Sequence, residues 1–214
     1  LQPRYRGAVL SLPDFYRDVP RLRVRDPLAD FLGAAEGGVL DYGYEDAVKL
    51  AGHSCPTVAS AYALGCHALA ALYPGELPER GGVRIDFAEP VDSGVSGVIA
   101  SVLTLLTGAA QQGGFKGIGG YFVRRDLQHF GVELPLSLRF TRLDSGKSVD
   151  AAAELARVPP HPEASALLGL CLRGQADPDA RRRFGELWQQ RVARILLEHW
   201  DDEAVFQVSD CALP

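Results

Sequence analysis

The feature that most constrains the fold is a long apolar segment with a sharp start and a sharp end. Pro56 opens the segment and Pro74-Gly75 closes it. Apolar or small residues recur between these points at spacings of three and four, as on one face of an α-helix: Val58, Ala61, Tyr62, Gly65, Leu69 and Leu72. Proline favours the first helical position, where its missing N–H is not needed. The pattern therefore predicts a long helix over residues 56–73 with Cys55 at its N-cap.

Shorter patterns predict the elements around this helix. The expected helices are 41–52, 93–107 and a C-terminal αα-hairpin of 162–174 and 178–200; the expected strands are 83–87, 133–143 and 147–156. This order predicts an α+β fold, with the long helix packed on a mainly antiparallel sheet.

Three segments are expected along the chain. They are an N-terminal arm with a short helix (1–39), a central domain (40–158) and the helical hairpin with a tail (159–214). Residues 1–27 are rich in Pro and Arg and predict an arm or loop.

Composition excludes several classes of partner. The net charge of −5 gives no electrostatic basis for binding nucleic acid or an anionic membrane. No run reaches the roughly 18 apolar residues that a membrane-spanning helix needs. Four widely spaced cysteines without a CxxC pair predict reduced thiols and a cytoplasmic protein. The chain contains no Met, so the sequence is also compatible with a removed leader.

The chemistry is concentrated just before the long helix, in the motif Gly52-His53-Ser54-Cys55-Pro56. A thiol at a helix N-cap lies where backbone N–H groups and the helix dipole favour the thiolate. His53 precedes Cys55 by two residues, and in extended chain such residues point to the same side. Imidazole and thiolate together suit zinc. The motif thus predicts a metal site, although a structural cysteine beside a surface histidine fits the same spacing.

Further candidates lie outside the motif. His129 is a third possible ligand, because it follows the glycine-rich loop 108–120, and Glu45 and Asp92 are weaker acidic candidates. The loop lacks both the Walker and the dinucleotide-binding patterns. Lys116 and Arg124, with Arg125, would give the loop an edge that attracts anions.

The motif, together with Leu106-Thr107-Gly108 and the glycine-rich loop, resembles the E subunit of formylmethanofuran dehydrogenase and its stand-alone relatives, over residues 40–155. The resemblance implies an α+β domain that forms homodimers and binds a divalent metal, often zinc, through His53 and Cys55. It also implies a link to C1 or formyl-group metabolism. Family members often carry cysteines where this chain has Ala109 and Val98, so other groups would complete the site.

Three functional hypotheses follow. The first is a metal-binding protein in which His53 and Cys55 hold zinc, or a larger metal-containing prosthetic group, that acts on a small carbonyl or formyl compound. The second is an enzyme without metal, with Cys55 as nucleophile and His53 or His129 as base. The third is a non-enzymatic accessory subunit of an oxidoreductase complex, which binds its partner through the C-terminal helices.

Overall fold

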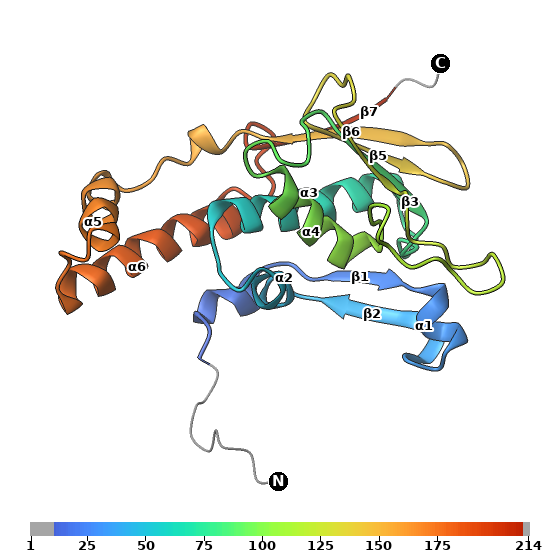
Figure 1. The fold of residues 1–214 in the computed structure, drawn as a ribbon, viewed down its shortest axis with the longest axis horizontal. Coiled ribbons are helices and arrows are strands. Elements are labelled where there is room, and N and C mark those ends of the chain that lie inside the picture. The colour runs from blue at the N-terminus through green and yellow to red at the C-terminus, as the bar shows by residue number, and fades with distance from the viewer. Residues whose placement is uncertain (1–10, 212–214) are drawn as a thin grey trace, which may run out of the picture.

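The computed structural model describes residues 11–211, and two central helices lie in it between a five-stranded sheet and a two-stranded hairpin (Figure 1). The central helices are α3 (Pro56–Leu72) and α4 (Ser96–Thr107). The larger sheet has the order β4-β3-β5-β6-β7, with bounds β3 (Val83–Phe87), β4 (Gln128–Phe130), β5 (Leu138–Arg142), β6 (Ser148–Ala153) and β7 (Phe206–Asp210).

The hairpin pairs β1 (Leu22–Arg25) with β2 (Val39–Tyr42) in antiparallel register. The elements near it are η1 (Asp14–Asp18), α1 (Pro27–Phe31), η2 (Glu36–Gly38) and α2 (Tyr44–Ala51). After β6 the chain forms η3 (Leu155–Arg157), α5 (Pro162–Leu172), α6 (Pro178–Ala193) and the π-helical turn η4 (Arg194–Glu198).

The α+β prediction is confirmed, and so is the prediction that the long helix packs on a mainly antiparallel sheet. α3 contacts β5, β6 and β7, and β3–β4 is the only parallel pair in the sheet. Twelve of the 17 residues of α3 are buried, so the helix is covered on nearly every side. Small side chains make this possible, because they let neighbouring backbones approach closely. Gly65 is the clearest case: a Cβ there would lie 2.7 Å from Leu106 Cδ1 of α4.

Several expectations for the first part of the chain were wrong. Within the predicted arm, residues 14–18 form η1 and residues 22–25 form β1, whose apolar side chains enter the core: Tyr16, Val19, Leu22 and Val24 are buried. Residues 1–10 lie outside the described part. β1 also pairs with β2 across the predicted segment boundary at residue 39, and β2 occupies the start of the expected helix 41–52.

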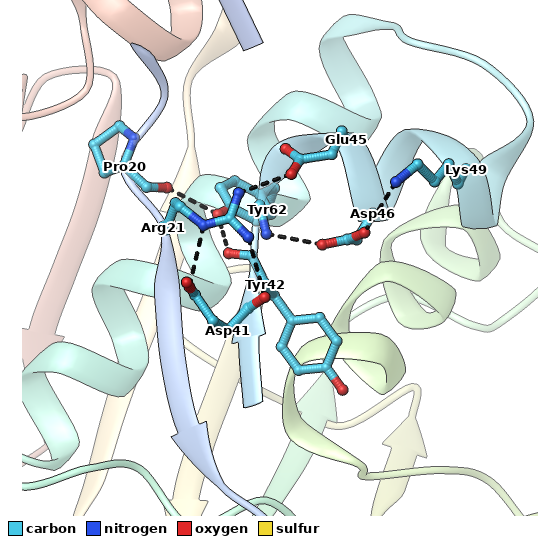
Figure 2. A network of polar contacts seen from close by, with 9 residues as sticks. Pro20, Arg21, Asp41, Tyr42, Glu45, Asp46, Lys49 and Tyr62 are labelled. Carbon is cyan, nitrogen blue, oxygen red and sulfur yellow. Dashed lines mark hydrogen bonds and ion pairs between the residues drawn. The ribbon is translucent and has the colours of Figure 1, made fainter. Parts of the chain in front are cut away.

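A polar network joins the β1–β2 hairpin to α2 and α3, the helices on either side of the motif (Figure 2). Arg21 donates to Glu45 Oε1 of α2 at 2.7 Å and to Asp41 Oδ1 at 3.2 Å. The Tyr62 hydroxyl of α3 donates to the backbone carbonyls of Pro20 and Tyr42, at 2.8 and 3.0 Å. The acid expected as a weak ligand, Glu45, is therefore held by Arg21.

The predicted αα-hairpin is confirmed as α5 and α6, which extend to one side of the sheet in Figure 1. α5 is mostly apolar in sequence, yet Ala164 is its only buried residue and Leu172 is 79% exposed. Among residues 11–211, no helix combines the length and the apolar character that a bilayer crossing requires.

The close packing of α3 on α4 leads to a stability prediction. Gly65→Val should lower the free energy of unfolding by about 1–3 kcal/mol, because the added carbons must displace Leu103 and Leu106. Gly185→Val in α6 is the matched control, since a Cβ there meets no atom within 4 Å. The control should change stability by no more than about 0.5 kcal/mol. Equal effects in urea unfolding would contradict the close α3–α4 contact.

Candidate functional site

The predicted motif forms a sharp corner between α2 and α3. Gly52 ends α2 in the left-handed conformation, with φ of 75°, which residues with a side chain rarely adopt. Three residues later the backbone is extended at Cys55, and Pro56 begins α3. The local sequence thus accounts for both sides of the corner.

Cys55 occupies the N-cap as predicted. It is 8% exposed, and its Sγ accepts a hydrogen bond from the backbone N–H of Val58 at 3.5 Å. The first backbone N–H groups of a helix have no partner within the helix, and they carry its positive dipole end. The sulfur therefore lies where negative charge is favoured.

His53 is exposed, and its ring is oriented by the end of α2. Its Nδ1 lies 3.0 Å from the carbonyl oxygen of Ala51. A carbonyl can only accept, so Nδ1 carries the proton in this contact, and in the neutral ring Nε2 is left with its lone pair. Metal-binding histidines commonly show this arrangement, in which one ring nitrogen donates to a carbonyl and the other faces the ion.

The described residues do not gather a third donor at the corner. No group of three or more His, Cys, Asp or Glu side chains within residues 11–211 is arranged to hold an ion. His129 lies on β4, where its Nδ1 is 3.0 Å from Asp86 Oδ1, so the chain does not place it with His53 and Cys55. Asp92 is on the exposed loop before α4. Imidazole and thiolate are donor types that suit zinc, but within residues 11–211 no group of donors reaches even three of the usual four positions.

Ser54, between the two donors, is the most connected residue of the corner. Its hydroxyl donates to Gln189 Oε1 of α6 at 2.9 Å and lies 2.9 Å from the hydroxyl of Tyr44. Its backbone carbonyl accepts from Trp188 Nε1 at 3.0 Å and from Gln189 Nε2 at 3.3 Å. Sequence reasoning missed this role, because the partners on α6 are 134 and 135 residues away.

A cavity of about 500 Å³ opens beside the first turns of α3. Thr57 and Ser60 line it from α3, and Ser96 and Ile99 line it from α4. Its other walls include one acid, Glu89, and apolar residues of the sheet: Phe87, Leu138 and Ala153. The cavity therefore pairs hydroxyl groups with an apolar floor, a combination typical of sites for small organic molecules.

The predicted anion-attracting edge is divided between two different environments. Lys116 is exposed on the glycine-rich loop. Arg124, by contrast, is buried, and its Nη2 donates to Asp26 Oδ1 at 2.7 Å. Arg80 donates to Asp26 Oδ2 at 2.8 Å. Burial pushes the pKa of Asp26 upward, but the hydrogen bond from Arg80 and the charge of Arg124 outweigh it, so the pKa lies below its ordinary 3.8.

Two residues on the far half of α3, Cys66 and His67, lie away from the corner. Cys66 is buried, and burial raises the pKa of its thiol to about 12. His67 is half-buried and lines a pocket with Trp200 and Phe206, and its Nε2 has no hydrogen-bond partner among the described residues. Burial lowers the pKa of His67.

Comparison with known proteins adds no relative. No family model matches the chain, and no curated protein does. The site is therefore interpreted from its own geometry.

The Ser54 contacts predict a measurable coupling between the corner and α6. Ser54→Ala and Gln189→Ala should each lower the free energy of unfolding by about 1 kcal/mol, because each leaves a polar partner unsatisfied. The double variant should lose less than the sum, with a coupling energy of about 0.5–1.5 kcal/mol in urea unfolding. Strictly additive losses would show that the hydroxyl–amide contact does not form.

The buried ion cluster predicts a pH-dependent loss of stability. Asp26→Asn keeps an N-cap acceptor for α1 but leaves Arg80 and Arg124 without their anion, which should cost about 3 kcal/mol at neutral pH. Because the pKa of Asp26 is lowered in the fold, its stabilisation is present above 3.8 and is lost as pH falls through the folded-state value.

Urea unfolding of both proteins across a pH series measures this. The difference should be constant from neutral pH to about pH 5 and should shrink below 3.8. A difference that persists unchanged in acid would mean that the charge of Asp26 is not its cause.

Proposed function

We propose that this protein binds a divalent metal, preferably zinc, at the corner before α3, with His53 Nε2 and Cys55 Sγ as its protein ligands. The observation that carries the proposal is the contact between His53 Nδ1 and the Ala51 carbonyl, because it leaves Nε2 as the free electron-pair donor. The N-cap position of Cys55 supports it, since a thiolate is the form that binds metal.

The proposal includes a small-molecule ligand beside the metal. Two protein donors leave coordination positions for water, for a substrate oxygen or for groups of a second copy of the chain. The cavity lined by Thr57 and Ser60 adjoins the first turns of the helix that Cys55 caps. A bound zinc ion would act as a Lewis acid on a carbonyl or formyl group. The chain's hydroxyl groups would orient that substrate, and the apolar floor would exclude water.

The resemblance of the motif to the E subunit of formylmethanofuran dehydrogenase supports the same function and suggests a C1 or formyl compound as substrate.

Elemental analysis of the purified protein tests the metal site. Protein reconstituted with zinc and desalted should retain about one ion per chain, or about one per two chains if two copies share it. His53→Ala combined with Cys55→Ser should retain less than about a tenth of that amount, because both donors are gone. His129→Ala is the matched control and should retain zinc fully, since His129 pairs with Asp86 on β4.

Equal zinc retention by the double variant and the unmodified protein would contradict the site. If neither retains zinc and Cys55 is alkylated faster than free cysteine, the nucleophile hypothesis replaces it, because the N-cap position favours the thiolate in that role too.

An accessory role has a separate structural basis. The α5–α6 hairpin extends beyond the sheet (Figure 1) and leaves apolar side chains such as Leu172 exposed. This surface would suit a partner subunit or a second copy of the chain, and either is compatible with metal binding at the corner.

A further inference from the structure

A second cavity, of about 510 Å³, lies on another side of α4, beside the glycine-rich loop. α4 contributes Ser101 and Thr104 to its wall, and the loop contributes Gly113 and Gly114. The remaining lining residues are apolar, amide-bearing or basic: Leu28, Arg80, Gly108, Ala110, Gln111, Phe115, Arg124 and Gln128. The lining contains two arginines and no acidic side chain.

Arg124 is the unusual member of this lining. It is only 6% exposed, and within the described residues its Nε and Nη1 have no hydrogen-bond partner. The chain around it is shaped to hold the guanidinium: a Cβ at Gly81 would overlap it, and a Cβ at Gly108 would lie 3.0 Å from Nη1. A buried guanidinium with unused donors is costly unless something satisfies them.

The buried charges at the cavity leave a cation in excess, and a further acid near Arg124, Glu79, is exposed and lies 3.9 Å from Arg25. Asp26 is the one buried anion in direct contact with the pair, and it is shared between Arg80 and Arg124. Arg80 also donates to the carbonyls of Leu105 at 3.1 Å and Thr104 at 3.3 Å. Its positive charge therefore also offsets the partial negative charge of the carbonyls at the C-terminal end of α4. Within the part of the chain that the structure describes, the Arg124 side chain has no such second acceptor. One buried carboxylate therefore faces two guanidinium groups, and the lining of the cavity itself contains no acid.

We infer that this cavity binds a small molecule through an oxyanion group, a carboxylate or a phosphate, with Arg124 as the principal cation. A guanidinium presents paired N–H donors that match the oxygens of both groups. The Gln111 amide supplies a further polar group in the wall, whereas the hydroxyls of Ser101 and Thr104 already donate to the carbonyls of Gly97 and Ala100. The site uses no residue of the proposed zinc centre, so either can fail without the other.

Titration with the two simplest probes tests the site and identifies its anion. Sodium phosphate and sodium acetate are added separately to the full chain in a cationic buffer, with sodium chloride holding the ionic strength constant. Calorimetry should show saturable binding of at least one probe with a Kd of about 1 mM or lower, and the melting temperature should rise with it. Preference for phosphate indicates a phosphoryl compound, and preference for acetate indicates a carboxylic acid.

A pair of variants at Ser101 locates the binding without disturbing the buried cluster. Ser101 is exposed on α4 and lines the cavity, so Glu and Gln are both tolerated there by the helix. Ser101→Glu should weaken binding by about tenfold or more through repulsion, whereas Ser101→Gln should stay within about twofold. Lys116→Gln should also stay within about twofold, because Lys116 is outside the cavity.

Two results would overturn the inference. One is the absence of saturable binding of either probe by the unmodified protein. The other is equal binding by the Glu and Gln variants at Ser101, which would place the anion elsewhere on the molecule.

Discussion

The burial of α3 on nearly every side is the constraint on which the rest of the structure depends. The larger sheet covers one side of the helix, and α4, α2 and the β1–β2 hairpin cover the others. Apolar surface removed from water stabilises such a core by roughly 25 cal/mol per Å², but only if the helix is narrow enough for its neighbours to meet it. Gly65 and the alanines of α3 provide that narrowness. The start of α3 is equally constrained. Cys55 accepts a hydrogen bond from one of the first backbone N–H groups, and Pro56 has no N–H, so burial leaves fewer of these groups unpaired.

α4 gives the structure two cavities of different character. Ser96 and Ile99, near its N-terminal end, line the cavity beside α3, which also has an apolar floor. Ser101 and Thr104, farther along, line the cavity that contains the two arginines. A single short helix thus separates a mainly apolar cavity, lined by hydroxyl groups and the acid Glu89, from a cavity suited to an anion. The separation has a physical reason. Placing the buried charge of Arg124 against the apolar floor of the first cavity would carry a large desolvation free energy.

The elements with strong local patterns could be predicted from sequence, and those held by distant partners could not. The length of α3, its N-cap and the C-terminal hairpin follow from proline positions and helical periodicity. β1, β2, β4 and β7 are only three to five residues long, and each becomes a strand because a partner strand pairs with it. The site divides in the same way. Cys55 at the N-cap follows from one proline, whereas the ion pair of Asp26 with Arg124 joins residues 98 positions apart.

Ser54 connects the proposed metal site to the C-terminal helices. It lies between the proposed metal ligands in the sequence. Its hydroxyl and its carbonyl both form hydrogen bonds with side chains of α6, the second helix of the C-terminal hairpin. A partner that bound the α5–α6 hairpin and displaced α6 would break or shift the hydrogen bonds that hold the backbone between His53 and Cys55. The two donors of a metal site must keep their separation to within a few tenths of an ångström for the ion to stay bound. The hydrogen bonds of Ser54 therefore make the geometry of the corner depend on the position of the C-terminal helices, although neither α5 nor α6 supplies one of the two proposed ligands.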